Sequence, residues 1–141
     1  MRSFSNVHRV VIKIGTSCLA AGNTIDTAYV RDIAAQTSRV MQLDKRVLIV
    51  SSGAIGMGAG ELGLTEKVNR IDMRQACAAL GQPLLMQEYR EAFADYGIKV
   101  AQVLLTSDVL ANRKSYLNLR NAVETLLGLG VVPIFNENDS V

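Results

Sequence analysis

The sequence has little cysteine and histidine, which limits the kinds of site that it can form. It contains two cysteines, Cys18 and Cys77, and a single histidine, His8. The cysteines lie far apart without the spacing of metal ligands, so we expect reduced thiols rather than a disulfide framework. One histidine supplies neither a multi-histidine metal site nor a histidine relay. We therefore interpret His8 as a surface residue and assign no metal ligands.

Long apolar runs and blocks of like charge are also missing. No run approaches the length of a membrane-spanning helix, and the first residues lack the apolar core of a signal peptide. The 15 basic and 13 acidic residues are scattered, with a formal net charge of +2 and no interleaving of basic and aromatic residues. This pattern argues against nucleic acid as the main partner. We expect a cytoplasmic protein that has neither nucleic acid nor a membrane as a partner.

Two familiar nucleotide-binding motifs are absent. There is no G-x-x-x-x-G-K-[ST] sequence, which excludes a Walker-type NTPase. The glycines between positions 53 and 60 do not form G-x-G-x-x-G in a first strand-to-helix turn, and no acidic residue closes a second strand. A nicotinamide-dependent oxidoreductase is therefore disfavoured.

The apolar residues that are present predict one α/β domain. The length of 141 residues and the 49% hydrophobic content suffice for a single core. Short apolar runs predict strands at 10–14, 47–50, 98–105 and 131–135, and helical spacing predicts helices at 25–43, 59–62, 71–96 and 119–127. Pro83 cannot donate to the helix ladder, so we expect a kink or two abutting helices near Gln82. The alternation predicts a mainly parallel sheet with helices on both faces.

Each predicted strand ends in small polar or charged residues. These residues are Gly15, Thr16 and Ser17 in the first case, Ser51 to Gly53 in the second, 106–108 in the third and 136–139 in the fourth. Because the carboxyl ends of parallel strands share one edge of a sheet, their coincidence predicts a single polar crevice there. Polar loops that coincide by chance are the less favoured explanation.

Three features of these strand ends admit two interpretations each. The glycines after Val50 either approach a ligand or pack a loop against a helix, and the residues alone do not favour one of these. Lys13, within an apolar strand, either reaches a phosphate or extends to solvent from an edge strand; the adjacent turn favours the phosphate. Asp139 either holds a substrate ammonium or belongs to a self-capping turn.

Five segments carry a resemblance to a known family. They are VVIKIGTS at 10–17, IVSSGAIGMG at 49–58, AALGQ at 78–82, YGIKVAQVLLT at 96–106 and PIFNENDSV at 133–141. In this order and spacing they resemble the glutamate 5-kinases of the amino acid kinase family. The resemblance implies a three-layer α/β/α sandwich. It also implies transfer of a phosphoryl group from ATP, with Mg²⁺, to the side-chain carboxylate of L-glutamate. This is the first step of proline biosynthesis and is usually inhibited by proline.

The resemblance also implies roles for individual residues. Lys13 would neutralise the transferring phosphoryl group, and the turn Gly15–Ser17 would wrap the phosphates of ATP. Ser52, with the backbone of Gly53–Ala54, would hold glutamate. Asp139 would take part in binding the amino group of the substrate.

The resemblance covers only part of a family kinase domain. We expect residues 1–141 to be the N-terminal, acceptor-substrate portion of one kinase domain whose C-terminal half is absent, and to be inactive alone. An unpaired sheet edge would favour a homo-oligomer. Three alternatives stay open: a non-catalytic module that binds glutamate or proline, the N-terminal part of a bifunctional pyrroline-5-carboxylate synthase, and a family kinase for another acceptor such as acetylglutamate, carbamate or uridylate.

Overall fold

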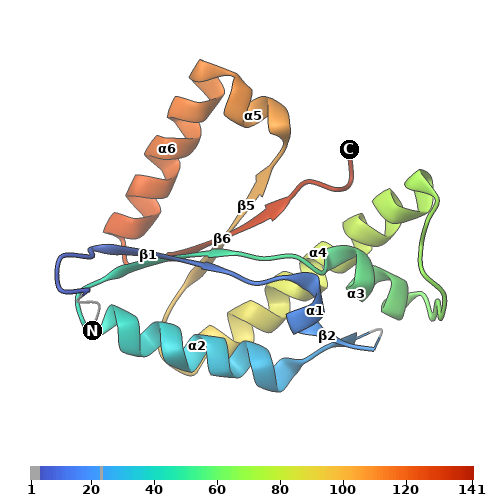
Figure 1. The fold of residues 1–141 in the computed structure, drawn as a ribbon, viewed down its shortest axis with the longest axis horizontal. Coiled ribbons are helices and arrows are strands. Elements are labelled where there is room, and N and C mark those ends of the chain that lie inside the picture. Colours follow the sequence, from blue (N-terminus) through green and yellow to red (C-terminus); the bar gives the residue numbers. More distant parts are fainter. Residues whose placement is uncertain (1–3, 23) are drawn as a thin grey trace.

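A parallel four-stranded sheet forms the centre of the computed structural model, which describes residues 4–22 and 24–141 (Figure 1). Its strands lie in the order β1-β4-β6-β5, and all neighbouring pairs are parallel. Their bounds are Arg9–Lys13 for β1, Arg46–Val50 for β4, Val100–Leu105 for β5 and Val132–Glu137 for β6. The four predicted strands are thus confirmed, and the last extends two residues further into its polar end.

Helices connect these strands and cover both faces of the sheet. The helices are α1 Thr16–Leu19, α2 Thr27–Met41, α3 Ala54–Glu61, α4 Ile71–Ala94, α5 Ser107–Ala111 and α6 Arg113–Gly128. Two short strands, β2 (Ala20–Ala21) and β3 (Thr24–Ile25), form an antiparallel pair between α1 and α2. The sequence did not predict α1, α5 or this pair, because segments of two to five residues are too short to show a hydrophobic period.

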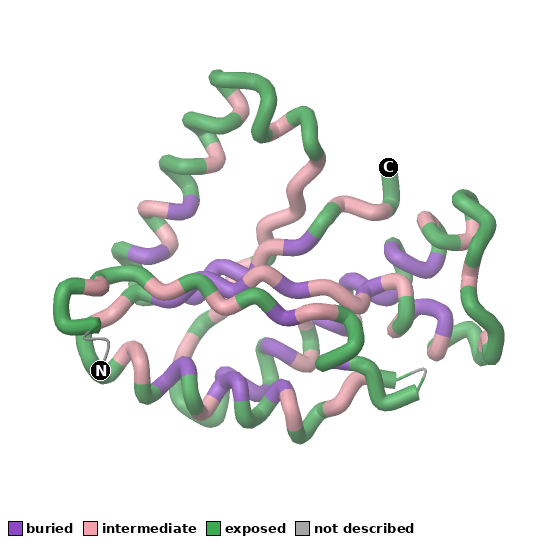
Figure 2. The backbone as a smooth tube through the Cα atoms, viewed as in Figure 1, coloured by how far each residue is buried: buried purple, intermediate pink, exposed green. Residues whose placement is uncertain are grey.

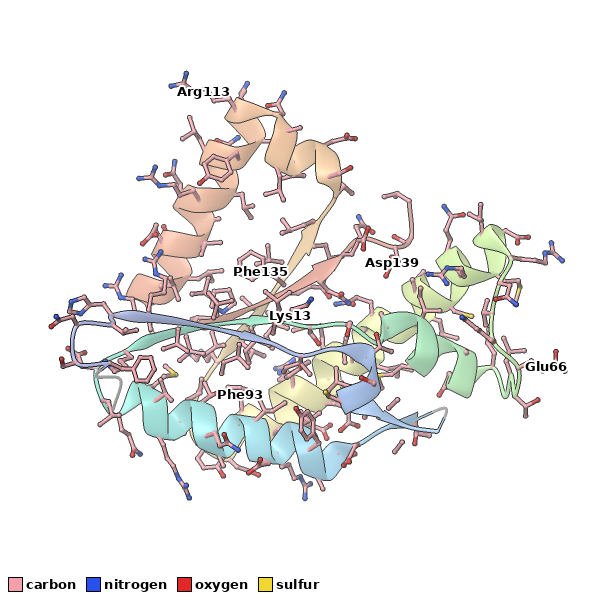
Figure 3. All side chains as sticks on the ribbon, in the orientation of Figure 1. Lys13, Glu66, Phe93, Arg113, Phe135 and Asp139 are labelled. Atoms are coloured by element: carbon pink, nitrogen blue, oxygen red, sulfur yellow. The ribbon has the colours of Figure 1, made fainter. Side chains whose placement is uncertain are left out.

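The molecule has three layers. Helices α2 and α4 lie on one face of the sheet and α6 lies on the other, with Phe93 on the first side and Phe135 on the second (Figures 1 and 3). The larger core lies between the sheet and α2 and α4, whereas Leu48, Val123 and Leu127 form a smaller one beneath α6. Figure 2 shows the buried residues concentrated along the central strands and on the inner sides of the helices. The predicted three-layer α/β/α arrangement is confirmed.

Strand position explains why two similar apolar runs differ in burial. Central β4 is covered on both faces, and its residues 47–49 are all buried, as a run without polar alternation predicts. In β1, which pairs only with β4 among the described residues, Val10 and Ile12 pack on the larger core while Val11 is 61% exposed. Side chains alternate between the faces of a strand, so Lys13 shares the open face with Val11.

Two predictions about the helices are wrong. The segment after Gly53 is helix α3 rather than a glycine loop. The segment 71–94 is a single helix that runs through Pro83, so the alternative of two abutting helices is wrong. Pro83 lies on the exposed side of α4, so the carbonyl group that lacks its helical donor can reach water.

Two glycines bring α3 and α4 into backbone contact. A Cβ atom added at Gly58 would lie 1.9 Å from the carbonyl oxygen of Cys77, and one added at Gly81 would lie 1.8 Å from that of Ala54. Only a residue without a side chain fits either position. Of the glycines after Val50, Gly58 is therefore a packing glycine.

Candidate functional site

The carboxyl ends of β1, β4 and β6 meet at a crevice of about 560 Å³. Three of the four predicted strand ends thus share one crevice. The end of β5 lines an adjoining cavity of about 320 Å³ instead, so the prediction of a single crevice for all four ends is wrong for that strand. The residues that line the crevice are Thr16, Val50, Ser51, Ser52, Gly53, Ile55, Gly56, Ala59, Glu66, Lys67, Val68, Arg74, Asn136, Glu137 and Asp139. A mixture of cationic, anionic and amide groups at one edge suits a small zwitterionic ligand.

Hydrogen bonds fix the turn that follows β4. The Ser52 hydroxyl donates to the carbonyl oxygen of Ile14 at 3.0 Å, and the Ser51 N–H donates to that of Phe135 at 2.8 Å. These bonds tie the turn to the segments that end β1 and β6. Gly53 has a φ of 98°, which suits glycine, and the chain then enters α3. The Ser52 oxygen keeps lone pairs that can accept from a ligand.

A buried tyrosine supports this turn from below. The hydroxyl groups of Ser51 and Tyr89 are hydrogen-bonded at 2.9 Å, and Tyr89, from α4, is fully buried. Burial raises the pKa of Tyr89 to about 12. The phenol therefore stays neutral at physiological pH and acts as a fixed polar support. The sequence does not predict this pair, because Tyr89 lies in α4, far along the chain from Ser51, and no local pattern links the two residues.

Helix α3 begins at the crevice and directs its unpaired N–H groups toward it. The first backbone bond of this helix runs from the Met57 N–H to the Gly53 carbonyl at 3.0 Å, so the preceding residues of the first turn have no helical acceptor. Gly53, Ile55 and Gly56 line the crevice, whereas Ala54 is buried beside it. Such a helix start attracts negative charge.

Lys13 is exposed on an edge strand, as in the second of its two interpretations. It ends edge strand β1 on the face that α6 leaves open, and no hydrogen bond or ion pair joins it to the described residues. Of the residues to which the family resemblance gives a phosphate-binding role, Thr16 lines the crevice, and Lys13, Gly15 and Ser17 do not. Gly15 and Ser17 flank Thr16 at the start of the short helix α1.

The polar end of β6 forms the opposite wall. Asp139 is half-buried, lines the crevice and has no hydrogen bond or ion pair within the described part of the chain. Its carboxylate is therefore available to a ligand. The turn does cap itself, but through Asn136 and Asn138, which accept from the Glu137 N–H and the Ser140 hydroxyl, and not through Asp139. Asn136 is buried behind it and donates to the Gln82 side chain at 2.8 Å.

Several lining residues were not predicted. Glu66 and Lys67 lie on the connection between α3 and α4, where Figure 3 labels Glu66. Arg74 lies in the first turn of α4. No local pattern marks these charges, because their proximity to β6 follows from the path of the chain. Asn136, which lines the crevice, and its hydrogen-bond partner Gln82, which does not, fall within the PIFNENDSV and AALGQ segments that carry the family resemblance.

The described residues do not suit a metal ion held by the protein alone. No group of three or more His, Cys, Asp or Glu side chains among residues 4–22 and 24–141 is placed to bind one. The isolated carboxylates at the crevice therefore do not form a cation cage, and no step is assigned to a metal here. In this same part of the chain no helix is long and apolar enough to cross a membrane.

A comparison with protein families agrees with this geometry. The model of the amino acid kinase family matches residues 8–141, which include every strand and the whole crevice. The chain belongs to the amino acid kinase family.

Curated relatives of this amino acid kinase chain include enzymes named glutamate 5-kinase. The protein from Methanosarcina barkeri is 52% identical over 96% of this chain and 37% of its own length. The protein from Geobacter sulfurreducens is 48% identical over 100% of this chain and 39% of its own length. The chain thus spans well under half of these relatives.

A solved structure with the same arrangement belongs to isopentenyl phosphate kinase. The similarity has a TM-score of 0.58 at 18% identity and covers 92% of this chain and 56% of the other. At that identity it supports the α/β architecture of the amino acid kinase chain and says nothing about its acceptor.

Proposed function

We propose that this chain forms the acceptor-substrate side of a glutamate 5-kinase, in which ATP phosphorylates the side-chain carboxylate of L-glutamate. The observation that carries the proposal is the convergence of Thr16, Ser52, Gly53 and Asp139 on one crevice in a chain 52% identical to a named glutamate 5-kinase. The crevice offers N–H donors and a free carboxylate, the two kinds of group that hold an amino acid.

The acceptor amino acid would lie between the two walls of the crevice. The Ser52 hydroxyl and the backbone of Gly53 and Ala54 would bind its carboxylate groups, because the start of α3 supplies unpaired N–H donors there. The Asp139 carboxylate would bind its ammonium group, which matches a carboxylate that has no partner in the described structure. Arg74 and Lys67 add positive charge at the same crevice.

Lys13, Gly15, Thr16 and Ser17 would contact the phosphates of ATP. In the transfer, a carboxylate oxygen of glutamate forms a bond to the γ-phosphorus as the bond to the ADP oxygen breaks, so atoms and charge balance. An exposed, unpaired lysine at the edge of the site can stabilise the charge of the transferring group. Mg²⁺ would arrive with the nucleotide and neutralise its phosphates, since the described carboxylates form no cage for it.

The extent of the matched region limits the activity that we assign to these 141 residues. They correspond to 37% of the Methanosarcina barkeri enzyme, so we expect them to bind the acceptor and to turn over little ATP by themselves. A place in proline biosynthesis in the cytoplasm, inhibition by proline and self-association through the open edge of β1 are further parts of the proposal.

Titration calorimetry tests the proposal and separates it from a non-catalytic sensor. The chain should bind L-glutamate, and Asp139→Asn or Ser52→Ala should weaken this binding by about tenfold, the loss of one charge-assisted or buried hydrogen bond. Addition of ATP with Mg²⁺ should change the glutamate affinity if the two sites adjoin, whereas a sensor should show no such dependence. Failure of glutamate to bind, or variants that bind like the native chain, would refute the assignment.

A further inference from the structure

Three amide side chains form a hydrogen-bonded row behind the crevice, and the proposed function gives them no task. Asn136 Nδ2 donates to Gln82 Oε1 at 2.8 Å, and Gln82 Nε2 donates to Gln102 Oε1 at 2.9 Å. We call these three residues the amide row. They belong to three elements, β6, α4 and β5, and the first two are only 6% and 9% exposed. Buried amide groups at a crevice normally have a structural or functional reason.

The backbone determines which way every amide in the row points. The Glu137 N–H donates to Asn136 Oδ1 at 2.9 Å, and a backbone N–H can only donate. The oxygen of Asn136 must therefore face Glu137, which leaves its nitrogen facing Gln82. Gln82 must then accept on that side and donate to Gln102 on the other. Rotation of any one amide by 180° would place two hydrogen-bond donors, or two acceptors, opposite each other.

The row is attached to α4 at the point where this helix meets both walls of the crevice. Gln82 follows Gly81, whose Cα lies so close to the Ala54 carbonyl that an added Cβ would be 1.8 Å from it. Ala54 begins α3, which forms one wall. Asn136 belongs to the other wall and precedes Asp139 by three residues. Two consecutive residues of α4 thus contact the two sides of the site.

We propose that Gln82 is a positioning residue for the amino-acid site. It holds the Asn136 amide in one orientation and thereby keeps the segment Asn136–Asp139 against the crevice, opposite the start of α3. This inference rests on the proposed function for the identity of the ligand. The orientation of Asn136 itself depends only on the hydrogen bonds of the described structure.

Gln82→Met tests this role because methionine has a similar length, suits a helix and forms no such hydrogen bonds. Gln87→Met is the matched control: Gln87 is an exposed residue of the same helix, and its side chain donates to Glu91. Gln102→Leu is a second test variant at an exposed position, which removes the outer partner and leaves the bond between Gln82 and Asn136 in place.

The first measurement is hydrogen exchange of the Asn136 side-chain amide by NMR in the ¹⁵N-labelled chain, with the signal assigned through Asn136→Asp. Gln82→Met should speed this exchange by about tenfold, which corresponds to one lost buried hydrogen bond. Gln102→Leu should have a smaller effect in the same direction, and Gln87→Met should have none. An unchanged Asn136 signal in both Gln82→Met and Gln102→Leu would overturn the inference without reference to any ligand.

The second measurement is the affinity for L-glutamate by calorimetry, with thermal unfolding recorded for each variant. Gln82→Met should bind glutamate about tenfold more weakly, and Gln87→Met should stay within about twofold of the native chain. Val123→Ala, which is destabilised beneath α6, should lower the melting temperature and leave the affinity unchanged. If the native chain binds glutamate and Gln82→Met binds equally well, the inference is wrong. If the native chain binds none, the proposed function fails, and the exchange experiment alone decides the role of Gln82.

Discussion

A methyl group at Gly58 would collide with the backbone of α4, because its Cβ would lie 1.9 Å from the Cys77 carbonyl oxygen. Neither helix can yield without a shift of the backbone. Gly58→Ala should therefore lower the free energy of unfolding by about 2–3 kcal/mol in urea denaturation. Gly56→Ala is the control, since the same helix leaves open space at that position. It should be neutral or stabilise by up to about 1 kcal/mol. Equal effects of the two changes would contradict the packing argument.

Tyr89 should make the protein sensitive to alkaline pH. Its pKa is about 12 in the folded chain against an ordinary value of 10, so above pH 10 the unfolded chain loses a proton that the folded chain keeps. The stabilisation is complete below pH 10 and is lost as the pH rises toward 12, in total about 2–3 kcal/mol. The free energy of unfolding, measured in urea at steps between pH 8 and 12, should fall over this interval.

Tyr89→Phe supplies the control for this pH dependence. The change removes the hydrogen bond to Ser51 and should cost about 1 kcal/mol at pH 8. It should also reduce the fall in the free energy of unfolding between pH 10 and 12. Some slope will remain because burial, together with the nearby Cys18, raises the pKa of Tyr29. An alkaline decline of the same size in the variant would show that Tyr89 is not its source.

Among the elements, α2 depends on a cap that the sequence shows directly. The Asp26 carboxylate accepts the Tyr29 N–H at 3.0 Å and caps the N-terminus of the helix. Asp26→Ala should lower the free energy of unfolding by about 1 kcal/mol, whereas Asp26→Asn, which keeps an acceptor, should cost much less. Thermal or urea unfolding of the two variants measures this difference. An asparagine variant as unstable as the alanine one would indicate that the cap contributes little.

The elements that could be predicted are those whose evidence is local. Residues 47–50 form an apolar run that suits a central strand, and α2 has both a helical period and its cap. Residues 54–58 of α3 are expected in a loop, because their glycines resemble a ligand-binding turn, and only the end of this helix is predicted. The partner of Gly58, Cys77, lies in another helix, and no neighbouring residue in the sequence reveals that contact.

At the candidate site, too, only the residues with local evidence could be predicted. Strand ends can be predicted, so Ser52, Gly53 and Asp139 were correctly expected at one edge of the sheet. The exposure of Lys13 could not be predicted, because it depends on whether β1 is a central or an edge strand. Lys67 and Arg74 reach the crevice only through the fold of the connection between α3 and α4.

At the scale of the whole molecule, the three layers place two free groups of opposite charge near one sheet edge. Lys13 ends β1 and Asp139 follows β6, with β4 between these strands (Figure 3). Neither side chain has a partner among the described residues. This arrangement fits a site in which an anionic phosphoryl group and a substrate ammonium group are held apart, as the proposed reaction requires.

The most direct test of the central claim is a chimera with the Methanosarcina barkeri glutamate 5-kinase, in which residues 8–141 of this chain replace the matching segment. Formation of ADP that depends on glutamate, with trapping of the acyl phosphate by hydroxylamine, reports phosphoryl transfer. The account predicts an active chimera in which Lys13→Ala lowers kcat far more than it raises KM for glutamate, while Asp139→Asn mainly raises KM. A folded chimera without glutamate-dependent turnover, or one in which Lys13→Ala affects kcat and KM for glutamate equally, would contradict it.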